Sequence, residues 1–261
     1  MFGVPRSGTS WLSQIFNSHP KVAFRYQPLF SYTHKGRLTE NSTKEQISDF
    51  FDEILNSQDE YVMMKTESQK GNPTFLKDNN PSYVMFKETR YLQVVENILL
   101  RCSDVKIIGL VRNPLATMAS WVKAPREFYP DWDVLDEWRF APSKNQGKVE
   151  EYFGFEKWKQ VATEFLSFQK EYPEQFCLVR YEELRENPLD KTKEIFQFCG
   201  LDSNTQVEEF LVQSRSKYDA NPYSVFRSKT TGDDWNEILP AVISDSIKSE
   251  LSDSPLRIFL N

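Results

Sequence analysis

Cysteine and histidine are scarce in this chain of 261 residues. The three cysteines, Cys102, Cys177 and Cys199, are odd in number, lie far apart and lack metal-ligand spacing. The two histidines, His19 and His34, are too few for a His-based metal site. The sequence therefore predicts reduced thiols, a cytoplasmic location and no metal.

Long apolar runs and an excess of positive charge are also missing. No segment is apolar over the length of a bilayer, and no basic region followed by an apolar stretch opens the chain. We therefore expect no membrane span and no signal peptide. The net charge of -6 argues against nonspecific binding to nucleic acid or anionic membranes. A local basic pocket for a phosphorylated ligand stays compatible with that charge.

The chain does contain enough apolar residues, 39% of the total, for one large core. Strands are expected near residues 2–4, 22–24, 61–65, 83–87, 105–111 and 176–179. Loops and amphipathic helices separate them, and a repeated β-loop-α order predicts a parallel sheet with helices on both faces. We expect one domain over residues 1–261, with an aromatic and charged insertion at 123–148.

Residues 3–10 have the Gly-x-x-x-x-Gly spacing of a phosphate-binding loop, from Gly3 to Gly8, between an expected strand and an expected helix. Backbone N–H groups at such a turn cradle an oxyanion. The fold class is thus predicted to be a P-loop-type three-layer α/β fold with a central parallel sheet flanked by helices. An ordinary strand-to-helix turn is the alternative.

The loop departs from that of a nucleotide triphosphatase. Thr9 stands where a triphosphatase needs lysine, and the positive charge lies earlier, at Arg6. Arg112 ends a buried strand where a magnesium-binding aspartate is expected. A single phosphosulfate group fits this loop better than a triphosphate, although a P-loop kinase or nucleotide hydrolase remains the alternative enzyme class.

A second anion site is expected at Arg112, because the carboxyl ends of parallel strands face the ligand. Ser120 lies on the following helix and adds a hydroxyl. An ion pair between Arg112 and a structural carboxylate is the competing interpretation.

Four segments together resemble the family of sulfotransferases that use 3′-phosphoadenosine 5′-phosphosulfate (PAPS), closest to the bacterial and carbohydrate types. They are residues 5–11 (PRSGTSW), residues 111–114 (VRNP) with Ser120, residues 179–201 (VRYEEL to CGL) and residues 226–235 (FRSKTTGDDW). Their order matches the family and they span nearly the whole chain. The resemblance implies transfer of a sulfuryl group from PAPS, which leaves 3′-phosphoadenosine 5′-phosphate (PAP), without a metal.

The resemblance also implies roles for individual residues. The phosphosulfate would be held by Arg6, Ser7, Gly8, Thr9, Ser10 and Trp11. Arg112 and Ser120 would hold the 3′-phosphate, and Trp11 and Tyr181 would lie near the adenine. The C-terminal segment would contribute Arg227, Ser228 and Lys229 to cofactor binding. Ser228 and Lys229 depart from the Lys-Gly usual in the cytosolic enzymes, which leaves their contribution open.

The general base is the least determined part of the site. The carbohydrate branch has glutamate in a Tyr-Glu-Pro-Leu element, but this chain has Gln27 there, which cannot accept a proton. The Lys-Thr-His stretch of the cytosolic branch resembles residues 87–89, so Glu88 is the first candidate and Lys87 would stabilise sulfuryl charge. His34 is the second candidate and Glu67 the third. Arg6 would stabilise the departing phosphate.

The insertion at 123–148 is expected to face the acceptor, which we predict to be a hydroxyl or amine of a small molecule or carbohydrate. Its aromatic residues suit a flat or sugar-like ligand, and its carboxylates favour a neutral or cationic acceptor over a polyanion. A solvated lid that packs on the domain is the alternative. A noncatalytic PAP(S)-binding protein of the same fold also remains open.

Overall fold

A computed structural model describes residues 1–219, 221, 223–226 and 234–260. Two pairs of parallel strands form its centre. The strands are β1 (Val22–Tyr26), β2 (Tyr83–Lys87), β3 (Ile107–Val111) and β4 (Phe176–Arg180). Val22 pairs with Tyr83 between β1 and β2, and Ile107 pairs with Phe176 between β3 and β4.

The N-terminal segment joins the two pairs into one sheet. Phe2 bridges Glu88 on one side and Gly109 on the other, both in parallel orientation. Its N–H donates to the Ile108 carbonyl at 2.8 Å, and its carbonyl accepts from the Leu110 N–H at 2.8 Å. The sheet order is therefore β1, β2, N-terminal segment, β3, β4. The chain first moves to one side of this segment and later to the other, so its carboxyl end is a topological switch point, where ligands bind in such folds.

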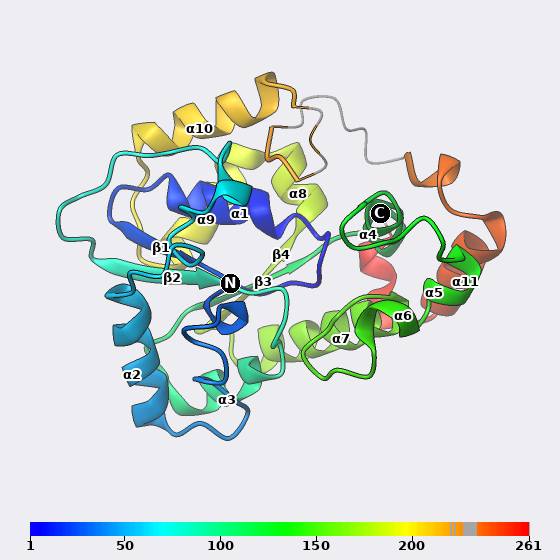
Figure 1. Cartoon of the computed structure of the whole chain (residues 1–261), viewed down its shortest axis with the longest axis horizontal. Helices are drawn as coiled ribbons and strands as arrows, with labels where there is room; N and C mark the ends of the chain where they lie inside the picture. The colour runs from blue at the N-terminus through cyan, green and yellow to red at the C-terminus, as the bar shows by residue number, and fades with distance from the viewer. Residues whose placement is uncertain (220, 222, 227–233, 261) are drawn as a thin grey trace.

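In the part of the chain that the structure describes, helices cover one face of the sheet. They are α1 (Thr9–Asn17), α8 (Tyr181–Glu186), α9 (Pro188–Phe198) and α10 (Thr205–Ser216). Ile15 of α1 and Phe196 of α9 belong to one buried cluster with Ile108 and Leu110 of β3. Figure 1 shows these helices together on the upper side of the strands.

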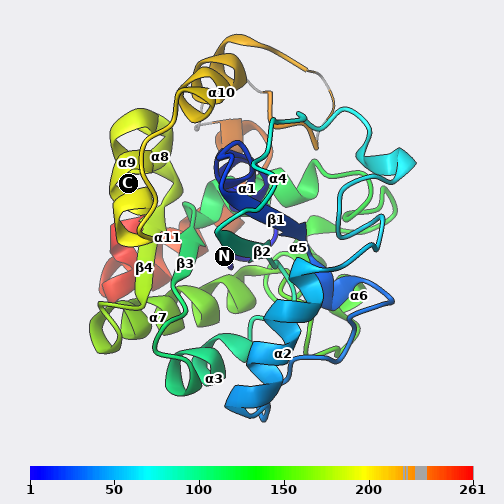
Figure 2. The ribbon, with the colours of Figure 1, turned by 90° about the vertical axis from the view of Figure 1, so that its left-hand side faces the viewer.

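A second layer covers the other face and one end of the sheet. Its helices are α2 (Lys44–Leu55), α3 (Val94–Arg101), α4 (Pro114–Val122), α7 (Phe155–Glu171) and α11 (Ala241–Ser252). Phe50, Phe165 and Ile247 share a buried cluster with Ile107 and Val111 of β3. Strand β3 thus buries alternate residues in two opposite cores, as a central parallel strand does. The predicted three-layer α/β fold is confirmed (Figures 1 and 2).

Local signals explain several helix boundaries. Thr43 and Gln46 form a reciprocal capping box at the start of α2. Asn113 caps α4, and Pro114 occupies its first position. The shorter elements are α5 (Val134–Glu137), α6 (Pro142–Asn145) and the 3₁₀ turns Pro28–Phe30, Glu67–Gln69, Asp234–Glu237 and Pro255–Phe259.

The strand expected at residues 61–65 is wrong. This segment is a turn, in which the Met63 N–H bonds the Asp59 carbonyl and the Lys65 N–H bonds the Glu60 carbonyl. The Asp59 carboxylate also accepts from the Val62 N–H at 3.0 Å. A short apolar run has the same pattern in a strand and in a turn that buries one side, so composition alone could not separate them.

The insertion at 123–148 packs largely on the domain. The ring of Phe128 lies 5.2 Å from that of Trp121, and Trp138 stacks on Phe155 at 5.8 Å. The Glu137 side chain is buried and accepts from the Ser143 N–H. The inner part of the insertion is therefore packed against the domain, and its exposed aromatic and acidic residues lie around this packed part.

The sequence predicted no membrane span and reduced thiols. Within the described ranges, no helix combines the length and the apolar character that crossing a bilayer requires. Cys102, Cys177 and Cys199 are free thiols. The cellular compartment stays a prediction.

Candidate functional site

The phosphate-binding loop is a tight turn between the N-terminal strand segment and α1. Arg6 has φ 71° and Gly8 has φ 95°, both in the left-handed region. Such a conformation costs a non-glycine residue free energy, and it recurs where a loop is shaped for a ligand. The Ser7 hydroxyl donates to the Val4 carbonyl and stabilises the turn. Helix α1 then starts at Thr9, so its free N–H groups face the loop.

Gly8 is required by the ring of Tyr181. A Cβ atom at Gly8 would lie 2.4 Å from Cδ2 and 2.5 Å from Cε2 of that ring. Only glycine leaves room for Tyr181 to lie against the loop, and glycine also accepts the positive φ without penalty.

A cleft of about 1100 Å³ opens beside this loop. Within the described part of the chain, its lining includes the cationic side chains of Arg6, Arg112, Arg185, Arg215 and Lys248. Two carboxylates, Glu182 and Glu186, also line it. A chain with a net charge of -6 therefore concentrates positive charge in one cleft, and such a cleft attracts anionic ligands.

Arg112 lies at the inner wall of the cleft. One guanidinium nitrogen, Nη1, donates to the Arg6 carbonyl at 3.2 Å, and the guanidinium lies 4.8 Å from the centre of the Tyr181 ring. Its Nε is buried and has no hydrogen-bond partner among the residues that the structure describes. Burial lowers the pKa of Arg112, yet an arginine keeps its charge. A buried cation with an unsatisfied donor fits an anionic ligand such as a phosphate.

The competing interpretation of Arg112 was an ion pair with a structural carboxylate. Across the described residues, Arg112 makes no ion pair within 4.0 Å. Glu182 is the nearby carboxylate, but its Oε1 accepts from the Asn113 N–H at 3.0 Å. The geometry therefore leaves Arg112 for a ligand.

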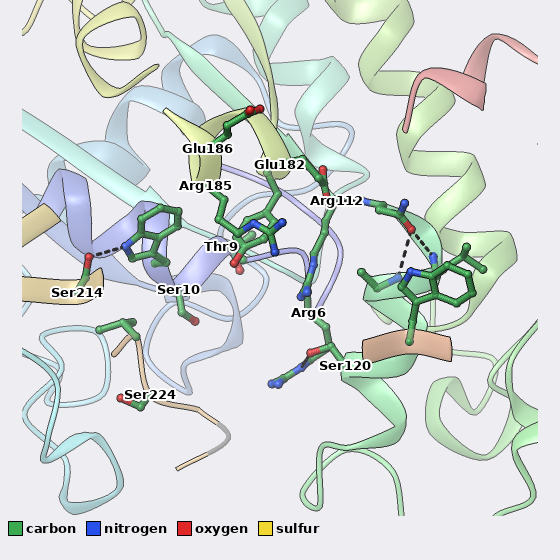
Figure 3. A pocket seen from close by; sticks show the side chains of 18 of the residues that line it. Arg6, Thr9, Ser10, Arg112, Ser120, Glu182, Arg185, Glu186, Ser214 and Ser224 are labelled. Atoms are coloured by element: carbon green, nitrogen blue, oxygen red, sulfur yellow. Dashed lines mark hydrogen bonds between the residues drawn. The ribbon is translucent and has the colours of Figure 1, made fainter. Parts of the chain in front are cut away.

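Ser120 lies beside the loop. The Arg6 Nε donates to the Ser120 Oγ at 3.2 Å, so both anion-binding segments predicted from the sequence meet at one place. Figure 3 shows Arg6, Arg112 and Ser120 on one side of the cleft and Ser214 on the other.

Two aromatic residues form the other side. The rings of Trp11 and Tyr181 lie edge to face, 6.1 Å apart. The Trp11 Nε1 donates to the Ser214 Oγ at 3.0 Å, which fixes the indole on α10. Aromatic faces of this kind bind a flat ring such as a nucleobase.

Several lining residues were missed by the sequence prediction. Arg185 follows Tyr181 by four residues on α8, so helical spacing could have indicated it. Arg215 and Lys248 come from distant segments without a local motif. Only the tertiary fold brings them to the cleft.

Lys87 extends from the end of β2 to the start of α1. Its ammonium lies 3.4 Å from the Ser10 Oγ and 4.7 Å from the centre of the Tyr26 ring. Burial lowers the pKa of Lys87 to about 8. The loop, the Ser10 hydroxyl and the Lys87 ammonium thus lie next to one another as hydrogen-bond donors.

The three candidates for the general base are held apart from these donors. Glu88 is fully buried, its Oε1 accepts from the Leu29 N–H at 2.7 Å, and burial raises its pKa to about 8. His34 is buried, lies 2.9 Å from the Ser57 Oγ and does not line the cleft. Glu67 is exposed and pairs with Lys70.

Gln27 is part of a polar contact network. Its Nε2 donates to the Thr89 Oγ1 at 2.6 Å, and its Oε1 accepts from the Tyr61 hydroxyl at 2.9 Å. The predicted contributions of Arg227, Ser228 and Lys229 lie outside the described residues.

Comparison with known proteins agrees with these features. A family model described as the sulfotransferase domain matches residues 1–249. Carbohydrate sulfotransferase 3 of Tetronarce californica is 26% identical over 160 residues, 60% of this chain and 36% of that protein. Carbohydrate sulfotransferase 1 of Danio rerio is 30% identical over 110 residues, 41% of this chain and 26% of that protein. The matches thus span only about a quarter to a third of these relatives.

Solved structures share the fold at low sequence identity. Mouse sulfotransferase SULT7A1 complexed with PAP superposes with a TM-score of 0.62 and 16% identity, covering 99% of this chain and 85% of that one. The sulfotransferase domain from the Synechococcus PCC 7002 olefin synthase gives a TM-score of 0.53 and 16% identity, covering 96% and 92%. With the loop at residues 3–8 and the family model over nearly the whole length, the chain belongs to the sulfotransferase domain family.

Proposed function

We propose that this protein transfers a sulfuryl group from PAPS to a hydroxyl or amine of a small-molecule or carbohydrate acceptor. The observation that carries the proposal is the cation-lined cleft, in which the loop and the buried Nε of Arg112 lie side by side. The crystallised relative SULT7A1 binds PAP, and the curated relatives act on carbohydrates by name.

Different residues would bind different parts of the ligand. The loop and the start of α1 would hold the 5′-phosphosulfate through backbone N–H groups and Arg6. Arg112 and Ser120 would hold the 3′-phosphate, and Trp11 with Tyr181 would contact the adenine. When bound, PAPS supplies a sulfuryl group attached to a good phosphate leaving group. Lys87 and Ser10 would then lie beside the sulfuryl oxygens.

The acceptor would approach from the side of Tyr26 and Tyr61. Their rings lie 5.3 Å apart, and Phe30 lies 6.1 Å from Tyr61. Phe30 is partly exposed, so these aromatics offer a flat surface to an acceptor ring. Nearby Glu127 and Glu151 favour a neutral or cationic acceptor over a polyanion.

The first experiment is calorimetric binding of PAP, 5′-AMP and ATP-Mg²⁺ to the wild type and to Arg112→Ala. We expect PAP to bind much more tightly than 5′-AMP, and Arg112→Ala to remove at least ~10-fold of that preference, about 1.4 kcal/mol. Arg101→Ala is the matched control, because Arg101 is an exposed arginine on α3 outside the cleft. A preference for ATP-Mg²⁺, or indifference to the 3′-phosphate, contradicts the donor assignment.

A second experiment follows ³⁵S from labelled PAPS into phenols, amines and neutral or sulfated sugars. Transfer to neutral or cationic acceptors is the expected result. Tight PAP binding without transfer to any acceptor in the panel would instead identify a noncatalytic nucleotide-binding protein of this fold.

A further inference from the structure

Four glutamates of the described chain have a buried carboxylate oxygen without a hydrogen-bond partner. They are Glu88, Glu127, Glu151 and Glu182. An unsatisfied carboxylate oxygen is costly to bury, and it is free to accept a proton from a ligand. Each of the four is therefore a candidate for the proton acceptor in sulfuryl transfer.

Three of them are poorly placed. Glu88 is fully buried and its other oxygen is held by the Leu29 N–H. Glu151 is bonded by the Arg90 Nε at 2.9 Å, and no described interaction joins it to the loop. Glu182 accepts from the Asn113 N–H on the Arg112 side of the cleft, where the 3′-phosphate would bind.

Glu127 differs in position, although its Oε2 is itself buried. Its Oε2 lies 3.7 Å from the Arg6 Nη1, and its side chain is 26% exposed. It is the member of the four that forms an ion pair with the phosphate-binding loop. Glu127 is not among the residues that line the cleft, but it contacts Arg6, which does line it.

The backbone of Glu127 is fixed by buried neighbours. The Trp121 Nε1 donates to the Glu127 carbonyl at 3.0 Å, and the Glu127 N–H bonds the Ala124 carbonyl at 2.9 Å. Trp121 is fully buried at the end of α4, and Phe128 packs on its ring. The insertion therefore fixes the backbone that carries this carboxylate, and a supported backbone is what a catalytic group requires.

Charged groups on several elements surround Glu127. Arg6 comes from the loop, Lys87 from β2 and Lys144 from α6. Burial lowers the pKa of both lysines, and the Glu127 charge partly opposes that shift. Tyr26 of β1 responds to the same charge, although burial is the larger cause of its raised pKa. The carboxylate thus lies within electrostatic range of Lys87, the residue proposed to contact the sulfuryl oxygens.

We propose that Glu127 is the general base of the sulfuryl transfer, which rests on the function proposed above. The acceptor oxygen forms a bond to sulfur while the bond from sulfur to the phosphate oxygen breaks. The electron pair of the broken bond stays on that phosphate oxygen, which leaves PAP. The acceptor proton moves to the Glu127 carboxylate and from this partly exposed side chain to solvent, so the products are a sulfate ester, PAP and one proton.

The test compares two phenols at neutral pH. Phenol keeps its proton at this pH and needs a base, whereas pentafluorophenol is ionised and needs none. In single turnovers with saturating PAPS, Glu127→Gln is expected to slow phenol sulfation by ~10²–10⁴-fold and pentafluorophenol sulfation by less than ~10-fold. Asp131→Asn is the matched control, an exposed carboxylate of the same insertion that should leave both rates unchanged. Equal losses for both phenols, or no loss, overturn the assignment.

Water serves as the acceptor when no phenol is added, and PAP release then reports hydrolysis of PAPS. Glu127→Gln should slow this hydrolysis by a factor similar to that for phenol. A wild type that releases PAP with neither phenol nor water overturns the proposed function, and this inference with it.

PAP affinity gives a readout that needs no turnover. Removing a negative charge 3.7 Å from Arg6 should leave PAP binding equal or several-fold tighter in Glu127→Gln, and Asp131→Asn should match the wild type. Weaker PAP binding in Glu127→Gln would show that this residue positions Arg6 for the cofactor, and would overturn its role as a base.

Discussion

The guanidinium of Arg112 lies 4.8 Å from the centre of the Tyr181 ring, and one edge of the same ring lies against Gly8. Tyr181 also contacts Trp11 edge to face. A single side chain of α8 therefore touches the phosphate-binding loop, the buried arginine and the aromatic wall of the cleft. The spacing between the two proposed phosphate sites depends on this ring.

Replacing Tyr181 tests that dependence. Tyr181→Leu removes the cation–π contact, worth about 0.5–2 kcal/mol, and leaves a gap beside Gly8. We expect PAP affinity to fall by ~10-fold or more. Tyr181→Phe keeps the ring and should bind PAP within about threefold of the wild type, as calorimetry can measure. Equal affinities for the two variants would contradict a positioning role for the ring.

Gly8→Ala tests the loop itself. The added methyl group meets the Tyr181 ring at 2.4 Å, and the residue has φ 95°. We expect the variant to lose ~1–3 kcal/mol of unfolding free energy in urea and most of its PAP affinity.

Gly71→Ala is the control for backbone cost. Gly71 has φ 105°, and an added Cβ there meets nothing within 4 Å. This variant should lose only the ~1–2 kcal/mol that a left-handed alanine costs, and it should bind PAP normally. If both variants lost the same stability and both bound PAP normally, the close packing of Tyr181 would have no functional effect.

Local sequence patterns were sufficient to predict the strands, the loop and the buried arginine segment around which the site is built. Three features depend only on neighbours in the chain, so they could be predicted. They are the alternation of buried strands and helices, the glycine spacing of the loop and the Arg112–Pro114 segment. The segment at 61–65 could not be predicted, because a buried turn held by the Asp59 carboxylate has the apolar pattern of a strand.

The outer parts of the cleft and the base depend on tertiary contacts. Arg215 and Lys248 reach the cleft only through the packing of α10 and α11. Glu127 was one carboxylate among several in the insertion, and its contact with Arg6 follows from how Trp121 anchors that turn. Glu88 looked suitable from its place beside Lys87, but no sequence pattern indicated that it would be completely buried.

The pH dependence of the reaction should report Lys87. Its pKa is lowered by burial to about 8, so in the free enzyme the ammonium is present below that pH and lost above it. We expect kcat/KM to fall above about pH 8, because a neutral amine cannot stabilise the sulfuryl oxygens. Lys87→Met should lower kcat/KM by ~10²–10³-fold and abolish this alkaline limb.

Lys77 provides the control for that limb. Burial also lowers its pKa to about 8, but its ammonium bonds the carbonyls of His19 and Val22, whereas the Lys87 ammonium lies at the Ser10 Oγ beside the phosphate-binding loop. Lys77→Arg should keep the limb in the pH profile of kcat/KM. If Lys77→Arg lost the alkaline limb and Lys87→Met kept it, the limb would report a loosening of the structure around Lys77 and not the charge of Lys87.

Glu88 should affect stability through its protonation. Burial raises its pKa from 4.5 to about 8, so between these values the folded protein holds this proton and the unfolded chain releases it. The unfolding free energy contributed by Glu88 is therefore fully present below pH 4.5 and is lost as the pH rises toward 8. At pH 7 the folded carboxyl is mostly protonated, which is a poor state for a base.

Glu88→Gln keeps an oxygen for the Leu29 N–H but cannot ionise. In urea unfolding at pH 5, 6, 7 and 8, the variant should equal the wild type at the lowest pH and become progressively more stable than it toward pH 8. Glu67→Gln, at an exposed site, should follow the wild type throughout. Parallel curves for Glu88→Gln and the wild type would mean that Glu88 is ionised in the folded protein, and they would restore it as a competitor of Glu127 for the acceptor proton.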